Sequence, residues 1–471
     1  MKICLVAEGS YPYITGGVSS WIQSLISNIS EHEFIVYTIG AEKKLKGKFK
    51  YSLPNNVSHV VETFLDEFDE NGDQWGGRYN LSLEEKAAIR SLLDSRTTKW
   101  DVLFSLFSSH RIKSVTSFLK SRDFFEIVQE ICLEKYSEIP FTEMFWTLRS
   151  MVLPLFLAIK NSLPEADIYH SVSTGYAGVI GSLGSFLYDK PLVLTEHGIY
   201  TREREEEIIK AKWVKGYFKD LWIQYFYNMS NCTYSYANNI VTLFNKNKEI
   251  QIELGCAENK ISIIPNGIDI KNFEALSLKQ EKSKDDIFIG AIVRVVPIKD
   301  IKTMLQSFSI VKASVPNAKF YILGPLDEDK EYYEECVQLV NSLHLKDVIF
   351  TGEVNIKDYI MQLDILVLSS ISEGQPLAIL EGMACGKPFV ATDVGNCKGL
   401  LMGEADDLGA AGIIVPMMQY VMMGQAIIKL CENAKLRKSY GENGKKRVRT
   451  FYQKETFIDN YKQLYNKTVI N

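Results

Sequence analysis

The stretch Asp364–Gly395 reads DILVLSSISEGQPLAILEGMACGKPFVATDVG. Its opening apolar run, Ile365–Leu368, has the length and branched side chains of a strand buried in a parallel sheet. Polar residues predict a loop after it, and Pro376 suits the first position of a helix. Gly386 predicts the end of that helix, and residues 389–391 predict the next strand. This order of elements predicts a doubly wound α/β sheet.

The same stretch places two carboxylates around a helix N-terminus. Glu373 lies in the predicted loop, and Glu381 lies one to two turns inside the helix. Free N–H groups near Pro376 favour an anion, and a carboxylate in the helix can accept hydrogen bonds from the two vicinal hydroxyls of a ribose. Two acidic residues at this spacing are usually solvated surface charges, but the strand-loop-helix setting favours a site.

The spacing of Glu373 and Glu381, with the flanking GQPLAILEGMACGKPFVATDVG, resembles the E-x7-E signature of the family 4 retaining glycosyltransferases. The resemblance implies a GT-B fold, in which two Rossmann-like doubly wound parallel-sheet domains face each other across a cleft. It implies transfer of a sugar from a nucleotide diphosphate donor with retention of configuration, and uridine is the expected nucleotide. The donor-binding residues that it implies here are Glu373, Gly374, Gln375, Pro376, Leu377 and Glu381.

Composition limits the alternatives. A chain of 471 residues with 46% hydrophobic and 24% charged residues is typical of a globular protein with two to three domains. The net charge of −5 argues against nucleic acid as the main partner. The eight cysteines form no C-x2-C pair, which predicts reduced thiols in the core.

The chain shows no pattern of a targeting or membrane-spanning segment. The first apolar run, Ile3–Ala7, is too short for a signal peptide, and Met151–Ile159 is too short to span a bilayer. We therefore expect a cytoplasmic protein without a transmembrane segment, free or peripheral at the inner face of the plasma membrane.

Two glycines follow the first predicted strand, which ends at Glu8. Gly16 and Gly17 directly precede a helix predicted from Val18, as in a loop that approaches a phosphate or a sugar closely. A tight turn alone could explain one of the glycines, and the pattern is not G-x-G-x-x-G. We expect both glycines to contact the donor.

The rest of the first domain contains a helical insertion and a second candidate site. Residues 62–161 begin with an acidic stretch and continue as amphipathic helices, with Ser82 and Glu85 as a possible capping box. His197 follows the predicted strand Leu192–Thr195, at the sheet edge where ligands bind. A lone histidine is more often structural, but this position favours a catalytic role.

The segment EHGIYTREREEEI, residues 196–208, resembles the corresponding segment of the glycosyltransferases of Pel exopolysaccharide synthesis. That resemblance implies a growing polysaccharide as acceptor and an inner-membrane polysaccharide synthase complex as partner. Residues 210–229 follow, and beyond Lys210 the side chains of Lys212, Lys215 and Lys219 are predicted near one helical face with Trp213, Phe218 and Trp222 between them. They form either a solvated stripe over core aromatics or a helix that docks to a membrane or a partner.

The second domain is predicted to hold the diphosphate. Arg294 and Lys299 flank RVVPIK at a strand end and could neutralise two phosphates. The pair resembles the family's G-R-L-x-x-x-K segment, although Ala291–Val293 replaces the glycine that often precedes its arginine. Gly352, Glu353 and Val354 resemble the loop that cups the nucleotide base.

The resemblance covers nearly the whole chain and suggests its division. We expect an acceptor domain at 1–275, a nucleotide-sugar-binding domain at 276–450, and a helix at 451–471 that crosses back to the first domain. The boundary falls in the polar, non-periodic residues 274–286.

No metal or other cofactor is expected, and the UDP-sugar is a donor substrate. Asp406 and Asp407 are adjacent, and Asp66, Asp69 and Asp73 do not match the spacing of a D-x-D metal-binding triplet. Arg294, Lys299 and the helix N-terminus can stabilise the leaving diphosphate instead.

Two alternatives remain open from the sequence: a UDP-sugar 2-epimerase on the same architecture, and a non-catalytic nucleotide-sugar-binding subunit of a membrane synthase. The transferred sugar is also open among glucose, N-acetylglucosamine and N-acetylgalactosamine, because hexose and N-acetylhexosamine differ at one substituent. The acceptor linkage and the oligomeric state are not determined by the sequence.

Overall fold

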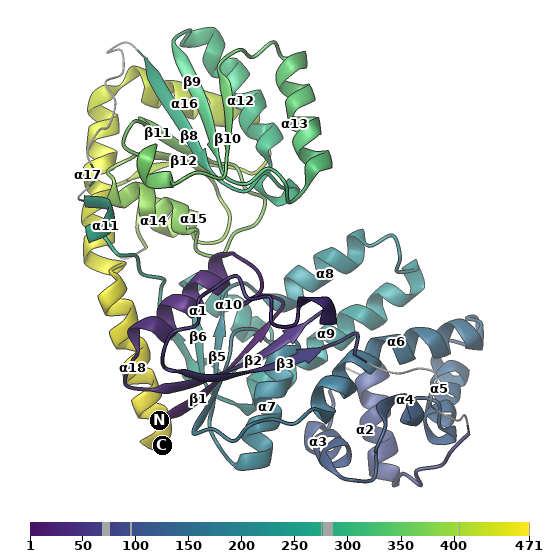
Figure 1. Cartoon of the computed structure of the whole chain (residues 1–471). Helices are drawn as coiled ribbons and strands as arrows, with labels where there is room; N and C mark the ends of the chain where they lie inside the picture. Colours follow the sequence, from purple (N-terminus) through teal and green to yellow (C-terminus); the bar gives the residue numbers. More distant parts are fainter. Residues whose placement is uncertain (68–75, 95–96, 275, 277–285, 405, 471) are drawn as a thin grey trace. The chain divides into compact units, whose positions relative to one another are not determined.

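A computed structural model describes the chain except for residues 68–75, 95–96, 275, 277–285, 405 and 471 (Figure 1). It divides into two compact units. The first unit contains Met1–Ile264 and Tyr461–Asn471, and the second contains Pro265–Asn460. Most of the predicted linker, together with Asp69 and Asp73 of the acidic stretch, lies outside the described residues.

The first unit is built on a parallel sheet of seven strands in the order β3-β2-β1-β4-β5-β6-β7. The order reverses between β1 and β4, which is the switch point of a doubly wound sheet. The strands are β1 (Lys2–Glu8), β2 (Glu33–Gly40), β3 (Val57–Phe64), β4 (Ile168–Ser171), β5 (Leu192–Glu196), β6 (Ala237–Thr242) and β7 (Ile261–Ile263).

Helices of the first unit pack on this sheet, and the inserted helices extend the unit beyond one side of the sheet (Figure 1). The predicted capping box forms, since the N–H of Ser82 donates to Glu85 Oε2 (2.7 Å) and the N–H of Glu85 donates to Ser82 Oγ (3.1 Å). The helices are α1 (Gly17–Asn28), α2 (Leu83–Asp94), α3 (Trp100–Ser108), α4 (Val115–Phe118), α5 (Arg122–Lys135), α6 (Phe141–Lys160), α7 (Tyr176–Tyr188), α8 (Tyr200–Lys210), α9 (Gly216–Tyr236) and α10 (Asn245–Glu253).

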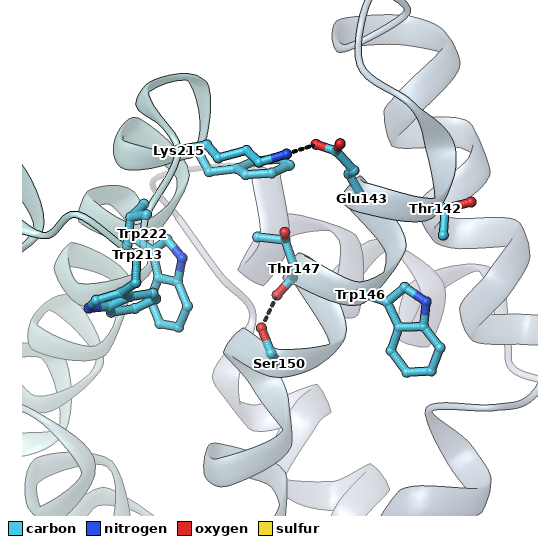
Figure 2. Close-up of a pocket in the computed structure, with 10 residues that line it drawn as sticks. Thr142, Glu143, Trp146, Thr147, Ser150, Trp213, Lys215 and Trp222 are labelled. Atoms are coloured by element: carbon cyan, nitrogen blue, oxygen red, sulfur yellow. Dashed lines mark hydrogen bonds and ion pairs between the residues drawn. The ribbon is translucent and has the colours of Figure 1, made fainter.

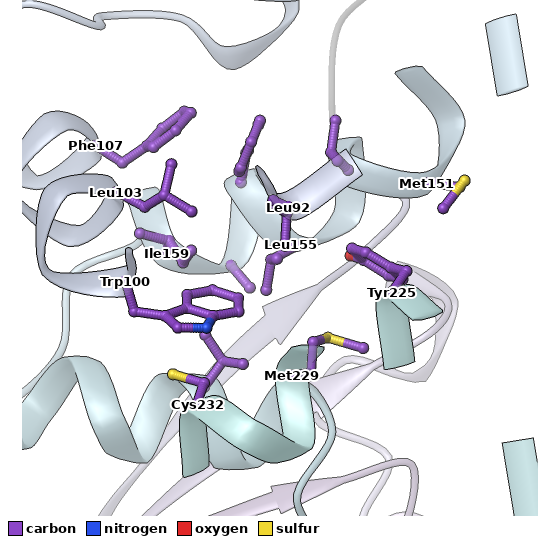
Figure 3. Packing of buried hydrophobic residues seen from close by; sticks show 14 of the residues in the cluster. Leu92, Trp100, Leu103, Phe107, Met151, Leu155, Ile159, Tyr225, Met229 and Cys232 are labelled. Carbon is purple, nitrogen blue, oxygen red and sulfur yellow. The ribbon is translucent and has the colours of Figure 1, made fainter. Parts of the chain in front are cut away.

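The inserted helices α2–α6 share one core with the sheet. Buried side chains of α2, α3, α6 and α9 converge there, among them Leu92, Trp100, Leu155 and Met229 (Figure 3). The same cluster continues into Cys4 and other strand residues. The insertion is therefore part of the first unit's core, and its helices begin only after β3, which includes residues 62–64.

Helix α6 is the one helix in the described part of the chain that is long and apolar enough to cross a membrane by length and composition. It contains the apolar run seen in the sequence, but it is 20 residues long. Leu148, Val152, Leu155 and Phe156 are among its many residues buried in the unit's core. The apolar surface of α6 is therefore largely used in packing.

The second unit has a parallel sheet of six strands in the order β10-β9-β8-β11-β12-β13. Its strands are β8 (Ile287–Ile292), β9 (Ala318–Leu323), β10 (Val348–Gly352), β11 (Ile365–Leu368), β12 (Phe389–Thr392) and β13 (Gly412–Val415). Its helices are α11 (Lys271–Glu274), α12 (Ile301–Ser314), α13 (Lys330–Ser342), α14 (Leu377–Ala384), α15 (Cys397–Met402), α16 (Tyr420–Glu432) and α17 (Ala434–Phe451). Two such sheets confirm the predicted fold class.

The last helix, α18 (Lys454–Ile470), begins in the second unit and ends in the first. Tyr465 hydrogen-bonds through its hydroxyl to Nδ1 of buried His170 (2.7 Å), and the Tyr461 hydroxyl to Thr195 Oγ1 (3.0 Å). These buried hydrogen bonds fix the end of α18 on the first sheet.

The basic aromatic stretch departs from its prediction. Helix α8 ends at Lys210 and α9 begins at Gly216, so Lys212, Lys215 and Lys219 do not share one helical face. In the connection between the two helices, the Val214 side chain is buried in the core. The neighbouring Trp213 side chain is 70% exposed. The prediction of a single basic stripe is therefore wrong.

All eight cysteines are buried and free, which confirms the predicted core thiols. Helix α7 packs closely on its neighbours through its glycines. A Cβ at Gly178 would lie 2.2 Å from Thr233 Oγ1 of α9, and one at Gly184 would lie 2.5 Å from the Tyr169 ring of β4.

Candidate functional site

The loops at the carboxyl edge of the second sheet hold most of the predicted site residues. Arg294 follows β8, residues 352–354 end β10, and residues 369–376 connect β11 to α14. The turn after β12 contains Gly395. Since all six strands are parallel, these loops emerge at one edge of the sheet, where doubly wound folds bind ligands.

An ion pair joins two of the predicted residues. Lys299 Nζ lies 2.5 Å from Glu373 Oε1, and the two side chains are only 17% and 11% exposed. Ser370 Oγ donates to the same carboxylate oxygen (2.5 Å). A cation and a carboxylate are therefore held together at this edge, one from each of two loops.

The backbones of these two loops are also tied together. The N–H of Ile371 donates to the carbonyl of Ile298 (2.9 Å), and Ser369 Oγ donates to the carbonyl of Lys299 (2.9 Å). Thr392 Oγ1 donates to the carbonyl of Ser370 (2.7 Å). The site around Glu373 is thus positioned by strands β11 and β12 before any ligand binds.

Arg294 has a different partner from Lys299. Its guanidinium lies 2.7 Å from Glu328, and both side chains are partly exposed. Glu328 was not singled out in the sequence, although it is the central residue of Asp327-Glu328-Asp329, a D-x-D triplet that the prediction overlooked. The two predicted phosphate-binding cations therefore lie at the same sheet edge, each paired with its own carboxylate.

Gly395 supports the loop that carries Glu373. Its backbone has φ +49°, and a Cβ there would lie 2.1 Å from the carbonyl oxygen of Glu373. The N–H of Asn396 donates to the carbonyl of Gly374 (2.9 Å). Only glycine fits such a close approach in the left-handed region, so the turn after β12 shapes the loop.

Three buried polar atoms on or beside this loop have no hydrogen-bond partner within the described residues. They are Gln375 Nε2, Asn266 Oδ1 and Asn396 Oδ1. Gln375 Oε1 is occupied, since it accepts from the N–H of Asn266 (2.6 Å). Buried polar atoms are rarely left unpaired in proteins, and polar groups of a ligand could pair with them.

Helix α14 begins as predicted, with Pro376 as its N-cap residue and no side chain capping its N–H groups. Glu381 lies one turn into it and is half-buried. Burial raises the pKa of Glu381 to about 7, against a smaller opposing effect of Lys357. Glu381 therefore changes charge near neutral pH, whereas an ordinary glutamate is ionised there.

The predicted base loop lies at the end of β10. Gly352 has φ +71°, Glu353 is exposed, and Val354 packs against the core. The N–H of Gly324 donates to the Gly352 carbonyl (3.1 Å), and a Cβ at Gly324 would lie 2.1 Å from the Val293 carbonyl oxygen. Gly324 thus joins the ends of three strands. Its position directly after a strand and before a proline was a usable sequence signal that the prediction missed.

The remaining predicted residues belong to the first unit. Gly16 and Gly17 are exposed at the start of α1, and a Cβ on either would meet no atom within 4 Å. Gly16 has extended backbone, which any residue adopts. Nothing within the first unit requires glycine at these positions, so their predicted role would depend on a ligand.

His197 lies at the carboxyl end of β5 with its ring 4.7 Å from the Trp21 ring. Burial lowers the pKa of His197 to about 4, so the imidazole is neutral at pH 7. Its Nε2 is buried and has no partner in the described part of the chain. A neutral imidazole can donate or accept one hydrogen bond to a ligand but supplies no positive charge.

The neighbouring Glu196 has a structural environment. Its buried carboxylate accepts hydrogen bonds from the Tyr234 hydroxyl (2.8 Å) and from Gln251 Nε2 (2.7 Å). These donors satisfy a carboxyl that burial would otherwise make costly. Of the pair Glu196 and His197, only the histidine has an unused polar atom.

The described residues contain no group of three or more His, Cys, Asp or Glu side chains that could hold a metal ion.

Comparison with known proteins finds a matching family for each half of the chain. Residues 1–259 match the family described as "Domain of unknown function (DUF3492)", and residues 272–447 match "Glycosyl transferases group 1". The chain is 24% identical over 334 residues to the capsular polysaccharide biosynthesis glycosyltransferase CapM of Staphylococcus aureus, covering 67% of this chain and 82% of CapM.

Two further proteins are similar. The UDP-Gal:alpha-D-GlcNAc-diphosphoundecaprenol alpha-1,3-galactosyltransferase of Escherichia coli is 27% identical over 335 residues, covering 68% of this chain and 80% of that enzyme. The structure of Anabaena HepE in complex with UDP has a TM-score of 0.62 at 15% identity and covers 99% of this chain and all of HepE, which shows the GT-B fold. Since its match to the first of these families covers more than half of the 471 residues, the chain belongs to the DUF3492 family, and its second unit contains a glycosyl transferases group 1 domain.

Proposed function

We propose that this chain is a retaining glycosyltransferase that moves a sugar from a UDP-sugar donor to a growing exopolysaccharide, as in the synthesis of a Pel-like polymer. The single observation that carries the proposal is the Lys299–Glu373 ion pair at the carboxyl edge of the glycosyl transferases group 1 domain. Glu373 lies in the loop that leads into the uncapped N-terminus of α14, and Glu381, the second residue of the E-x7-E pattern, lies in that helix.

In the proposed reaction, negative charge develops on the leaving diphosphate. Arg294, Lys299 and the N–H groups at the start of α14 stabilise that charge, since preorganised cations and dipoles act most strongly where charge develops. Glu381 accepts hydrogen bonds from the ribose hydroxyls, and residues 352–354 contact the base. Glu373 contacts hydroxyls of the transferred sugar.

Retention follows from attack of the acceptor hydroxyl on the face that the diphosphate leaves. No enzyme nucleophile is assigned to this step. The neutral His197 is proposed as a hydrogen-bonding group for the sugar or the acceptor, and Gly16 and Gly17 as a close approach to the donor.

The proposed acceptor is a polysaccharide, and the proposed partner is a polysaccharide synthase complex at the inner membrane face. Two similar proteins support a saccharide acceptor by their names: CapM is assigned to capsular polysaccharide synthesis, and the E. coli enzyme acts on a diphosphoundecaprenol-linked sugar.

A panel of nucleotide sugars tests the proposal. Thermal stabilisation by each member identifies the donor, because a ligand at 100 times its dissociation constant adds about 2.7 kcal/mol to the free energy of unfolding. Incorporation of the labelled sugar from that donor into polymer then tests transfer. Binding without transfer or donor hydrolysis would instead favour a non-catalytic subunit.

Transfer is expected to persist in excess EDTA. Arg294, Lys299 and helix N–H groups stabilise the diphosphate charge, so the proposed reaction uses no metal ion that EDTA could remove. The measurement is the initial rate of sugar transfer with and without EDTA. Complete loss of activity that Mg²⁺ or Mn²⁺ restores would contradict the proposal.

Donor affinity is expected to fall as the pH falls from 8 to 6. The pKa of Glu381 is raised to about 7, so its carboxyl gains a proton over this range and loses acceptor capacity for the ribose. If only the ionised form binds, the affinity falls about tenfold. Calorimetry should use the UDP-sugar, because the terminal phosphate of UDP itself titrates near pH 6.

Glu381→Gln is the matched control for this pH dependence, because its amide does not titrate. Its donor affinity should be weaker than wild type at pH 8 and nearly constant over the same range. An equal pH dependence in wild type and in Glu381→Gln would assign the effect to another group.

A further inference from the structure

An open pocket of about 450 Å³ lies in the first unit, between α6 and the connection from α8 to α9 (Figure 2). Pockets that bind small ligands are commonly about 300–1,000 Å³. Its lining belongs neither to the donor loops of the second unit nor to the region around His197. The lining combines tryptophan rings, hydroxyl groups and one ion pair.

Three tryptophans supply the aromatic surface. Trp213 is 70% exposed and Trp146 is 45% exposed. Trp222 lies 5.5 Å from Trp213, ring centre to ring centre, and packs against Phe226 at 5.9 Å, which holds it on α9. Figure 2 shows Trp213 and Trp222 together on one side of the pocket and Trp146 on α6. Exposed aromatic clusters of this kind mark binding sites.

Polar groups of α6 also line the pocket. Thr142, Trp146 and Ser150 follow each other at a spacing of four residues, so they share one face of the helix, and Thr147 lines the same pocket. The pocket therefore offers hydroxyl groups beside its aromatic surfaces.

An ion pair ties the two walls together. Glu143 Oε2 on α6 accepts from Lys215 Nζ (2.8 Å) and from the Tyr217 hydroxyl (2.6 Å). Lys215 and Tyr217 belong to the segment that follows Trp213, so the bridge holds that segment against α6. A carboxylate can accept further hydrogen bonds, so Glu143 retains acceptor capacity toward a ligand.

We propose that this pocket binds a neutral saccharide segment of the polysaccharide acceptor, away from the donor loops. A sugar ring has an apolar C–H face, which suits a tryptophan ring, and a rim of hydroxyls, which suits threonine, serine and carboxylate groups. Ser150 Oγ already donates to the carbonyl of Thr147 (2.8 Å), but an acyl chain or an apolar peptide helix would bury the hydroxyls of Thr142 and Thr147 against groups that cannot pair with them, which is unfavourable.

The inference rests on the proposed function, because the acceptor polymer is the saccharide that this enzyme would need to hold. A second contact with a long chain raises its effective concentration near the enzyme. The pocket should therefore affect binding of long acceptors more than binding of donor.

The test compares Trp213→Ala and Trp146→Ala with wild type and with Tyr420→Ala, which removes a similarly exposed ring from the second unit. Malto-, cello- and chitohexaose are titrated by calorimetry. At least one of them should bind wild type and Tyr420→Ala with equal affinity, and bind both tryptophan variants about tenfold or more weakly. All four proteins should give the same circular dichroism spectrum and thermal unfolding curve, which shows that the variants are folded, and should bind UDP equally.

Wild type that binds none of the three hexasaccharides at millimolar concentration, or tryptophan variants that bind them normally, would overturn the inference. Trp213-dependent binding to phosphatidylglycerol vesicles without hexasaccharide binding would overturn it in favour of a membrane surface. If UDP binds and transfer occurs but the pocket binds no saccharide, only this inference fails. If hexasaccharides bind at the pocket but UDP does not bind, the proposed donor fails instead.

Discussion

Replacing Lys299 or Arg294 with alanine is expected to lower the turnover number about 100-fold or more, because each removes a cation that stabilises charge on the leaving diphosphate. The effect at Lys299 has a second cause. Lys299 is the cationic partner of Glu373, whose side chain is only 11% exposed. Without Lys299 a poorly solvated carboxylate would face the diphosphate and repel it.

Lys302→Ala is the matched control for both variants. Lys302 lies one turn further along on α12, where it pairs with Glu335 at 2.7 Å and is 41% exposed. Its loss should leave turnover nearly unchanged, as expected for an exposed ion pair. Normal turnover in both Lys299→Ala and Arg294→Ala, with folding intact by circular dichroism, would remove these cations from the diphosphate site.

The second large effect concerns the different parts of the donor that Glu373 and Glu381 contact. Glu381→Gln should weaken UDP and intact donor alike by about 1.5–3 kcal/mol, the usual worth of a hydrogen bond to a charged group. Glu373→Gln should spare UDP binding and lower kcat, because its contact with the sugar matters most in the transition state.

Calorimetry with UDP on the two variants measures this difference directly. Ser370→Ala provides a control for Glu373→Gln, since it removes one hydrogen bond to Glu373 and keeps the carboxylate. It should lower kcat less than Glu373→Gln does. If Glu373→Gln weakens UDP as much as Glu381→Gln does, the two roles are assigned wrongly, even where the enzyme class is right.

The second sheet could be predicted because its elements are locally consistent. Ile365–Leu368 is an unbroken apolar run, Pro376 and Gly386 bracket a helix, and the structure has β11, α14 and a positive φ at Gly386 at these places. Buried parallel strands carry this signal in a few consecutive residues. The position of Glu373 and Glu381 relative to that helix followed from it.

Edge strands and short elements were harder to predict. Strand β3 lies at the edge of the first sheet, and most of its residues, including His59 and Glu62, are not fully buried, so its sequence lacks a continuous apolar run. Strand β13 has only four residues, and the Met-rich segment after it shows no clear hydrophobic periodicity. Neither strand was predicted.

Partners that lie far apart in the sequence could not be predicted from local pattern. Glu328 pairs with Arg294, and Lys299 pairs with Glu373, only because parallel strands bring their ends together. The interruption between α8 and α9 also depends on tertiary packing. Lys212 and Trp213 are compatible with a helix by propensity, but the connection is not helical where Val214 is buried in the core. These features depend on tertiary packing, which helix and strand propensities do not encode.

The most direct test follows a UDP-sugar labelled with ¹³C at C1 and C2 by NMR, in the presence of the purified protein and acceptor polysaccharide. The proposed function predicts release of UDP and a new glycosidic C1 signal with the same anomeric configuration as the donor, both lost in Lys299→Ala. Inversion at C2 without formation of a glycoside would contradict it and identify a 2-epimerase.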